Sequence, residues 1–173
     1  MVRVIMHGCN GKMGQVITRI IEEDPEVEIV AGVDAYMGIT NTYPVVESIE
    51  KCDIPADVVI DFSNAAAVDG VLDYCAERRI PVVLCTTGLS ETQLQHMEEA
   101  AKETAVLKSA NMSLGINLLM KLLKDAAKVL GTAGFDVEIV EKHHNQKVDA
   151  PSGTALALAD SVNEALEEAC TYN

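Results

Sequence analysis

The stretch EKHHNQKVDAPSGTAL, residues 141–156, brings together side chains that can move protons. The imidazoles of His143 and His144 can take up or release a proton near neutral pH, and Lys147 adds an ammonium group. Adjacent strand residues point to opposite faces, so the two histidines are not expected to bind one metal ion together. Ser152 lacks the surrounding sequence of a nucleophile elbow. The pattern therefore favours general acid–base chemistry over metal-dependent or nucleophilic catalysis.

The segment Pro151-Ser152-Gly153-Thr154 is typical of the start of a helix, with Ser152 or Thr154 near the N-cap. Free backbone amides at such a position, together with the two hydroxyl groups, can hold an anion such as a carboxylate. The combination predicts reduction of a small anionic substrate, with a hydride from a nicotinamide and a proton from the protein.

A second cluster lies near the N-terminus, where HGCNGKMG places glycines at positions 8, 11 and 14 between a predicted strand and a predicted helix. Small residues there let the backbone approach a pyrophosphate, which the helix N-terminus attracts. Asp34 ends the next predicted strand, where a carboxylate binds ribose hydroxyls. No basic residue directly follows Asp34, which favours NADH over NADPH, although Lys12 could reach a phosphate.

The elements that must position these residues alternate between strands and helices. We expect strands at 2–6, 27–34, 56–63, 81–88 and 105–110, and helices at 13–24, 67–79 and 91–103. Ser90 and Gln93 form a predicted capping box for the last of these helices. The alternation predicts an α/β fold with a Rossmann-like parallel sheet covered by helices on both faces. The loops CTTG (85–88) and SANMS (109–113) then follow strands and should line the nicotinamide side.

The pattern changes after residue 112, so we predict a domain boundary there, between a dinucleotide-binding domain at 1–112 and a second domain at 113–173. The expected elements are a helix at 114–131, a strand at 136–144 and a helix at 154–169. Apolar residues at helical spacing on the first of these should pack into a core. They are Ile116, Leu119, Leu123, Ala126 and Leu130.

The composition restricts the partners and the location. The net charge of −14 without a basic cluster argues against nucleic acid or an anionic membrane as a partner. Five scattered cysteines form neither a disulfide framework nor a zinc pattern. No signal peptide and no apolar stretch long enough to span a membrane are recognisable, so we expect a cytoplasmic protein.

The block EKHHNQKVDAPSGTAL closely resembles the signature of the 4-hydroxy-tetrahydrodipicolinate reductase (dihydrodipicolinate reductase) family. GCNGKMG, VIDFS, CTTG and SANMSLGIN resemble the family's other blocks, in the same order. The resemblance implies an NADH- or NADPH-dependent oxidoreductase of diaminopimelate and lysine biosynthesis, which reduces a cyclic imine dicarboxylate to tetrahydrodipicolinate. It also implies a homotetramer for the full-length family member.

The resemblance also implies roles for individual residues. His143 resembles the family's proton donor and acceptor and Lys147 its proton donor, while His144, Ser152, Gly153 and Thr154 resemble substrate-binding positions. The cofactor contacts it implies are Gly8, Cys9, Asn10, Gly11, Lys12, Met13, Asp34, Cys85, Thr86, Thr87, Ser109, Ala110, Asn111 and Met112. Met112 stands where an aromatic or another apolar residue is common. No metal site is expected.

The chain is roughly a third shorter than is usual in the family, and we interpret it as a fragment that lacks the C-terminal part. The resemblance implies that residues 113–173 are the N-terminal, incomplete part of an α+β substrate-binding and oligomerisation domain. Two alternatives stay open on the sequence alone. One is an amino-acid dehydrogenase of similar fold, which explains Asp34 but not residues 151–154. The other is a truncated, non-catalytic NAD-binding module.

Overall fold

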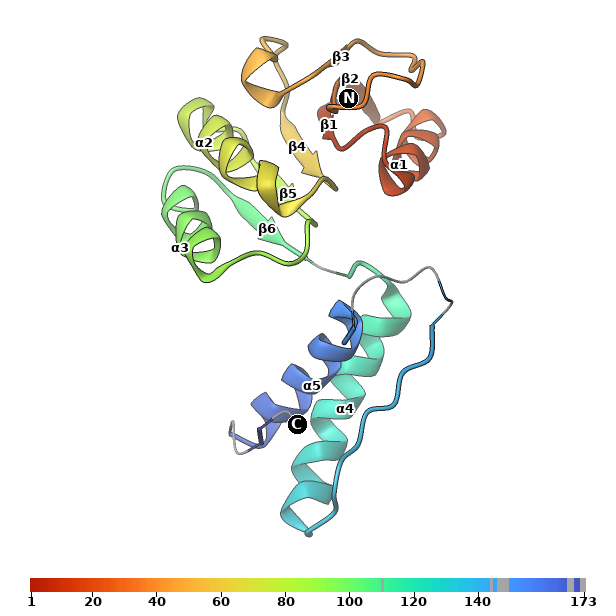
Figure 1. The fold of residues 1–173 in the computed structure, drawn as a ribbon, viewed down its shortest axis with the longest axis vertical. Helices are drawn as coiled ribbons and strands as arrows, with labels where there is room; N and C mark the ends of the chain where they lie inside the picture. The colour runs from red at the N-terminus through yellow and green to blue at the C-terminus, as the bar shows by residue number, and fades with distance from the viewer. Residues whose placement is uncertain (110, 144, 146–149, 168–169, 172–173) are drawn as a thin grey trace. The chain divides into compact units, whose positions relative to one another are not determined.

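The computed structural model describes residues 1–109, 111–143, 145, 150–167 and 170–171, and it divides into two units (Figure 1). The first unit is Met1–Ser109 and the second is Ala110–Asn173. This division lies three residues before the predicted domain boundary after residue 112. Each unit is described by itself below.

The first unit is built on a six-stranded sheet in which every strand pair is parallel. The strands are β1 (Val2–His7), β2 (Val27–Val33), β3 (Val45–Val46), β4 (Val58–Asp61), β5 (Val82–Leu84) and β6 (Val106–Lys108). Their order across the sheet is β3-β2-β1-β4-β5-β6. The order reverses its direction at β1, so the carboxyl ends of β1 and β4 meet where parallel sheets of this kind bind ligands.

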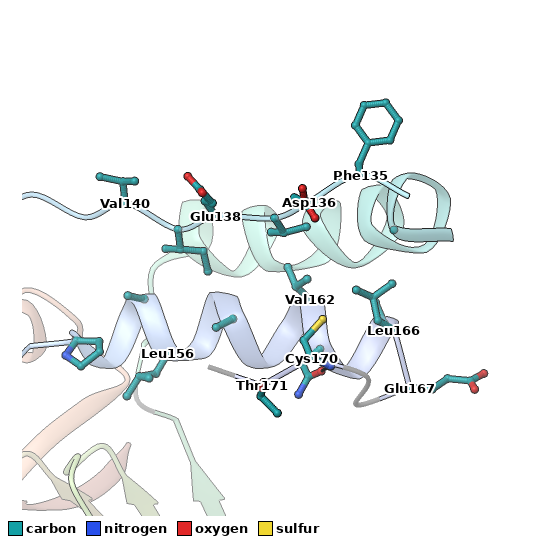
Figure 2. A pocket seen from close by; sticks show the side chains of 18 of the residues that line it. Phe135, Asp136, Glu138, Val140, Leu156, Val162, Leu166, Glu167, Cys170 and Thr171 are labelled. Atoms are coloured by element: carbon teal, nitrogen blue, oxygen red, sulfur yellow. Dashed lines mark hydrogen bonds between the residues drawn. The ribbon is translucent and has the colours of Figure 1, made fainter. Parts of the chain in front are cut away.

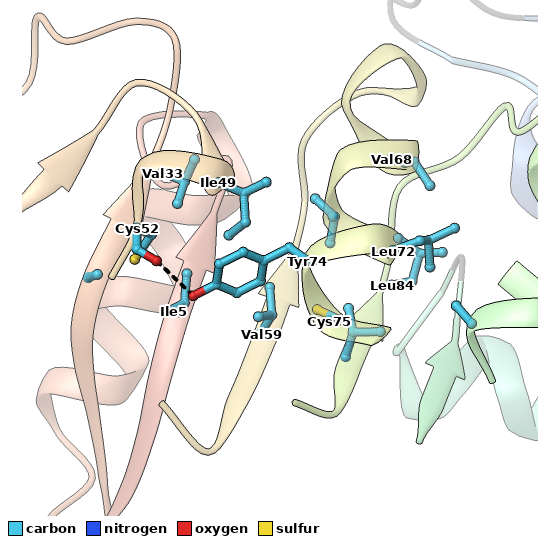
Figure 3. Packing of buried hydrophobic residues seen from close by; sticks show 14 residues of the cluster. Ile5, Val33, Ile49, Cys52, Val59, Val68, Leu72, Tyr74, Cys75 and Leu84 are labelled. Carbon is cyan, nitrogen blue, oxygen red and sulfur yellow. Dashed lines mark hydrogen bonds between the residues drawn. The ribbon is translucent and has the colours of Figure 1, made fainter. Parts of the chain in front are cut away.

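Helices cover both faces of this sheet, as predicted. Neighbouring residues of β1 point to opposite faces, so Met6 packs with Ile17 of α1 (Lys12–Glu22). Ile5 instead belongs to the larger core, to which Leu72 of α2 (Val68–Arg78) and Ala100 of α3 (Glu91–Ala100) contribute. Figure 3 shows this core, in which the side chains of α2 meet those of the strands. The predicted Rossmann-like α/β class is confirmed.

Local sequence signals predicted most of the first unit correctly. The five expected strands are present, although β4, β5 and β6 are shorter than their predicted ranges. The capping box before α3 is confirmed, since the Ser90 side chain accepts from the Gln93 amide and the Gln93 side chain reaches back to the Ser90 amide. The two-residue strand β3 was missed, because so short a run shows no alternation. Two short 3-10 helices, η1 (Ile49–Lys51) and η2 (Ala65–Ala67), complete the unit.

The described residues of the second unit form two helices, α4 (Leu114–Thr132) and α5 (Gly153–Ala165), which pack against each other. Both helices were predicted, and α4 ends before Gly134, which has a φ of +84°. The predicted strand at 136–144 is wrong for its described residues, because 136–143 form no ladder with any other described segment. An alternating sequence favours an extended chain, but a strand also needs a hydrogen-bonded neighbour.

The apolar stripe predicted on α4 is not a filled core in this chain. Ile116 and Leu123 are half-buried, whereas Leu119 and Leu130 remain 42% and 44% exposed. Ala127, outside the predicted stripe, is buried. The physical reason is that α5 is the one helix that packs extensively on α4, and a single neighbouring helix cannot cover an apolar face of this width.

Candidate functional site

The loop that joins β1 to α1 is shaped by glycines that no other residue could replace. Gly8 has a φ of +79°, and a Cβ atom there would lie 2.5 Å from the Phe62 carbonyl oxygen. A Cβ atom on Gly14 would lie 2.2 Å from the Gly8 carbonyl oxygen. This loop, residues 8–11, is called the nucleotide loop below. It folds closely against both α1 and the loop that follows β4, as a dinucleotide site requires.

The N-terminus of α1 is open to an anion. Gly11 is its N-cap and provides no side chain to accept from the first-turn amides. Lys12 and Met13, the first two residues of the helix, are exposed. These amides and the positive end of the helix dipole suit a pyrophosphate group.

Asp34 lies just after β2 and fixes the predicted nucleotide loop from the side. Its Oδ2 atom accepts from the Asn10 amide at 2.9 Å, and its Oδ1 atom accepts from the Tyr36 amide at the same distance. The Asn10 side chain donates to the Tyr36 carbonyl and accepts from Asn41 at 2.7 Å. Each Asp34 oxygen keeps further acceptor capacity for a ribose hydroxyl.

A cavity of about 370 Å³ opens beside this loop. Gly8, Gly11 and Asp34 line it together with His7, Glu47 and Glu50. Neither lysine nor arginine occurs among the described residues of its lining. Gly8, Gly11 and Asp34, which the sequence predicts for one site, thus line one cavity, whereas the sequence gives no indication of Glu47 and Glu50.

A buried carboxylate that sequence reasoning missed lies under the same edge of the sheet. Asp61 is the last residue of β4 and is 0% exposed. Its oxygens bind the Nδ1 atom of His7, the hydroxyl of Ser63 and the hydroxyl of Thr86, each at 2.6 Å. Burial acts to raise the pKa of Asp61, but these hydrogen bonds outweigh it and hold the pKa below its ordinary value. The available signal was an aspartate at the end of a strand in VIDFS.

The loop after β5 contains three of the predicted cofactor contacts. Cys85 and Thr86 are buried, and Thr87 is exposed. Burial raises the pKa of the Cys85 thiol to about 11, with a further contribution from the Asp61 charge. Cys9 in the nucleotide loop has a pKa of about 11 for the same reason, with Asp34 as the nearby charge. Both cysteines are therefore uncharged thiols at neutral pH.

The remaining predicted cofactor contacts fall in both units. Ser109 donates its amide to the Leu84 carbonyl at 3.0 Å, next to the end of β5. In the second unit the Asn111 side chain donates to the Thr154 hydroxyl at 3.2 Å, and Met112 is 53% exposed. Ala110 lies outside the described residues.

The start of α5 has the predicted cap. Ser152 is the N-cap, and its hydroxyl accepts from the Ala155 amide at 3.0 Å. Ser152 is itself 3% exposed, and its amide donates to Glu141 at 2.9 Å. Gly153 is exposed, and nothing lies within 4 Å of a Cβ atom built there. The surface at Gly153 and Thr154 is thus the accessible part of this helix start.

Of the predicted proton-transfer residues, the structure describes His143. Its Nδ1 atom lies 3.3 Å from Glu141, and its side chain is 40% exposed. Glu141 therefore holds both the imidazole and the Ser152 amide, which brings residues 143 and 152 to one carboxylate. His144 and Lys147 lie outside the described residues.

The second unit also has an open hollow of about 1290 Å³ between residues 135–141 and α5. Figure 2 shows Val162 of α5 and Leu166, the residue that follows this helix, beside the hollow, while Phe135 and Val140 project away from the helix. Most of its described lining residues are apolar, and it shares Glu141 with the candidate site.

Among the described residues, no group of three or more His, Cys, Asp or Glu side chains could hold a metal ion. No helix among them is long and apolar enough to cross a membrane.

Comparison with known proteins gives matches along nearly the whole chain. A family model described as "Dihydrodipicolinate reductase, N-terminus" matches residues 2–112, and one described as "Dihydrodipicolinate reductase, C-terminus" matches residues 115–172. A 4-hydroxy-tetrahydrodipicolinate reductase of Caldanaerobacter subterraneus is 54% identical over 99% of this chain and 67% of its own length. One of Clostridium tetani is 48% identical over the same shares. The chain thus spans about two thirds of the length of these relatives.

Solved structures agree with these matches. A dipicolinate-bound dihydrodipicolinate reductase from a Paenisporosarcina species has a TM-score of 0.79 at 30% identity. It is matched over 100% of this chain and 69% of its own. A homoserine dehydrogenase of S. aureus has a TM-score of 0.56 at 16% identity, a likeness of fold alone.

Proposed function

The chain belongs to the dihydrodipicolinate reductase family, and on that basis we propose that it is an NAD(P)H-dependent oxidoreductase. It reduces 4-hydroxy-tetrahydrodipicolinate to tetrahydrodipicolinate in diaminopimelate and lysine biosynthesis. The observation that carries the proposal is the match of both halves of the chain to this one family, at 54% identity to a reductase of that name. No observation favours an amino-acid dehydrogenase or a non-catalytic module.

The first unit suits the dinucleotide. The open α1 N-terminus at Gly11 accommodates the pyrophosphate, and Asp34 accepts hydrogen bonds from the ribose hydroxyls. We assign the cofactor contacts to Gly8–Met13, Asp34, Cys85–Thr87 and residues 109–112, as the sequence predicted. Supporting observations are the positive φ of Gly8 and the close approach of Gly14 to it.

We further propose that NADH is the preferred cofactor. The 2′-phosphate of NADPH needs a basic partner, and the cavity beside the loop carries Asp34, Glu47 and Glu50 instead. Glu47 is paired with Lys51 at 2.7 Å, so Asp34 and Glu50 are the carboxylates of this cavity that repel a phosphate dianion more strongly than they repel a hydroxyl group. Lys12 is exposed at the first position of α1, next to Gly11 of the cavity lining, and its positive charge could reduce the preference for NADH by pairing with the 2′-phosphate.

The second unit suits a small dicarboxylate. Gly153 and Thr154 at the start of α5 offer backbone amides and a hydroxyl group to a carboxylate, and His144 and Ser152 are the other proposed substrate contacts. The relative from Paenisporosarcina was solved with dipicolinate, which is itself a dicarboxylate. The hydroxyl of Ser152 already caps α5, so its contribution is to order the helix start.

A bound NADH or NADPH supplies the hydride for the reduction. The protein supplies the proton, and we assign that step to Lys147, with His143 as a further proton donor and acceptor. Glu141 lies against Nδ1 of His143, which leaves Nε2 as the nitrogen for proton transfer. The same carboxylate holds the start of α5, so it sets the imidazole relative to the carboxylate-binding amides.

We also propose a cytoplasmic homotetramer, as the family implies. The bacterial relatives and their metabolic function support the location. Apolar side chains on α4 that stay exposed in the single chain support association, among them Leu118, Leu122 and Val129 at 54%, 55% and 68% exposure.

The experiment that tests the function is NADH consumption with substrate generated in place from pyruvate and aspartate semialdehyde by the matching synthase. Oxidation that requires both precursors and the synthase is expected. Oxidation that proceeds when the synthase is omitted would contradict the assigned substrate, and homoserine offered with NAD would then test the dehydrogenase alternative.

A further inference from the structure

The buried carboxylate of Asp61 lies where three loops of the nucleotide site begin. In the sheet, β4 runs between β1 and β5, so Asp61 has His7 as its ladder neighbour on one side and Leu84 on the other. His7 directly precedes Gly8 of the nucleotide loop, and Thr86 lies two residues beyond Leu84. Ser63 belongs to the loop that follows β4 itself.

Backbone hydrogen bonds between these strands stop at this level. The Phe62 amide donates to the His7 carbonyl at 3.0 Å, and the Cys85 amide donates to the Asp61 carbonyl at 2.9 Å. Beyond these two backbone hydrogen bonds, the connection is made by the Asp61 carboxylate, which accepts three hydrogen bonds of 2.6 Å from His7, Ser63 and Thr86. The side chain of Asp61 therefore continues the cross-strand connection into the loops, where the backbone no longer provides it.

Packing alone does not require a carboxylate here. A buried charge costs several kcal/mol in desolvation, and an apolar residue of similar size usually serves a sheet core at least as well. Three hydrogen bonds, donated by His7, Ser63 and Thr86, offset the desolvation cost of the Asp61 carboxylate. Asp61 is completely buried, and two of the three loops that it connects contain predicted cofactor contacts.

The geometry of the nucleotide loop leaves little tolerance for a shift of these partners. Gly8 lies so close to the Phe62 carbonyl that even one added carbon atom would overlap it. His7 and Ser63 both line the 370 Å³ cavity together with Asp34. A movement of His7 against the β4 loop thus changes the shape of the surface that receives the dinucleotide.

We propose that Asp61 is a positioning residue for the cofactor, which sets the nucleotide loop, the Ser63 loop and the Thr86 loop relative to one another through His7, Ser63 and Thr86. The inference rests on the proposed function, because it takes the ligand of these loops to be NADH. Asp61 itself contacts no reacting atom. It acts through its three partners.

The test compares Asp61→Asn with Tyr74→Phe. The first substitution keeps the shape of the side chain but removes the charge and one acceptor oxygen. The second removes a buried hydrogen bond of the same unit, from the Tyr74 hydroxyl to the Cys52 carbonyl at 3.0 Å, which lies in the core and touches none of the three loops (Figure 3). The dissociation constant for NADH is measured by titration without substrate, at a temperature at which both variants are folded.

We expect Asp61→Asn to weaken NADH binding at least about tenfold relative to Tyr74→Phe, because the loops lose the charged acceptor that holds His7, Ser63 and Thr86 in place. Amide exchange measured by NMR should accelerate at Gly8, Phe62 and Cys85 in Asp61→Asn and stay unchanged there in Tyr74→Phe. Equal NADH affinities and equal exchange in the two variants would overturn the proposal, because Asp61 would then only stabilise the fold.

Ser63→Ala provides a second route should Asp61→Asn fail to fold. It keeps the carboxylate and removes one donor, so a smaller loss of NADH affinity is expected, with accelerated exchange at Phe62. Unchanged NADH affinity and unchanged exchange at Phe62 in Ser63→Ala would contradict the proposal.

These readouts separate the inference from the proposed function. Amide exchange at the three loops and NADH affinity need no dicarboxylate, so they decide the role of Asp61 even if the reductase assay fails. Turnover with the dicarboxylate tests the proposed function alone.

Discussion

Three carboxylates organise the candidate residues of the two units. Asp34 holds the nucleotide loop through the Asn10 amide, Asp61 ties the neighbouring loops together, and Glu141 connects His143 with the start of α5. In each case both oxygens have a partner, and at least one of these partners belongs to another segment of the chain. An acidic side chain in this protein thus serves as a connector as well as a surface charge.

The role of Asp34 is tested by Asp34→Ala. Loss of an acceptor for the ribose hydroxyls should weaken NADH binding by about tenfold or more, and should weaken NADPH binding less, because a nearby negative charge is removed. The measurement is the pair of dissociation constants from titrations with each cofactor. Asp53→Asn is the matched control, since it removes one charge from a side chain that is 90% exposed and outside the cavity lining. An unchanged NADH-to-NADPH ratio in Asp34→Ala would contradict the assignment.

Lys147 is tested by its effect on turnover. Lys147→Ala should lower the turnover number by about 10²–10⁴-fold, the usual contribution of a proton donor, and leave NADH affinity nearly unchanged. Lys142→Ala, which removes an exposed lysine five residues earlier, should leave both quantities close to the wild type. A parallel loss of NADH affinity in Lys147→Ala would show that this lysine binds the cofactor instead.

At the scale of elements, α2 and α3 are joined by a histidine that bridges two aspartates. His96 of α3 contacts Asp69 at 2.8 Å through Nδ1 and Asp73 at 2.9 Å through Nε2. The hydrogen bond to Asp69 contributes most to raising the pKa of His96 above its usual 6.5, and partial burial opposes it. Both ring nitrogens have carboxylate partners, so the protonated form is the one that fits.

This bridge makes stability depend on pH. A raised folded pKa means that the contribution is fully present below pH 6.5 and is lost as pH rises through the raised pKa of the folded state. The pKa of Asp69 is lowered by the same contact, so its share is lost only in strong acid. The melting temperature of wild type minus that of His96→Gln should therefore shrink between about pH 5 and about pH 9. The partners are largely exposed, which limits the effect to less than about 1 kcal/mol. A constant difference would contradict the account.

The start of α5 gives a further prediction for an element. Ser152→Ala removes the N-cap acceptor and should lower the free energy of unfolding by about 1 kcal/mol, measured by circular dichroism in denaturant. Ser152→Asn should retain most of that stability, because asparagine is a good N-cap. Ser161→Ala is the internal control, since its hydroxyl donates to the Ala157 carbonyl within the same helix and should matter little. Equal effects of Ser152→Ala and Ser161→Ala would mean that the cap does not stabilise α5.

At the scale of the whole molecule, local sequence patterns predicted most elements, and pairings across the chain decided the rest. The nucleotide loop and Asp34 were predictable because the signal lies within about 20 residues of βαβ sequence. The contacts of Asp61 were not, because they depend on β1, β4 and β5 being neighbours in the sheet. The prediction of a strand at 136–144 was wrong for a related reason. The alternating sequence pattern is present, but the described residues of this segment have no ladder partner among the described residues.

The apolar face of α4 shows the same limit. Helical spacing correctly predicts which side of the helix is apolar, but it does not say what covers that side. Within this chain α5 covers part of it, and Leu119 and Leu130 stay largely exposed. Burial therefore depends on the neighbours of α4 and cannot be deduced from the spacing alone.

The central claim is that a hydride passes from the nicotinamide to the cyclic dicarboxylate on this protein. The most direct measurement uses NADH with deuterium at both C4 positions, substrate generated in place by the synthase, and mass spectrometry of the product. The account predicts that the tetrahydrodipicolinate formed carries one deuterium and that its amount equals the NADH consumed. NADH that binds without being oxidised, or that is oxidised without deuterium in the dicarboxylate, would contradict it.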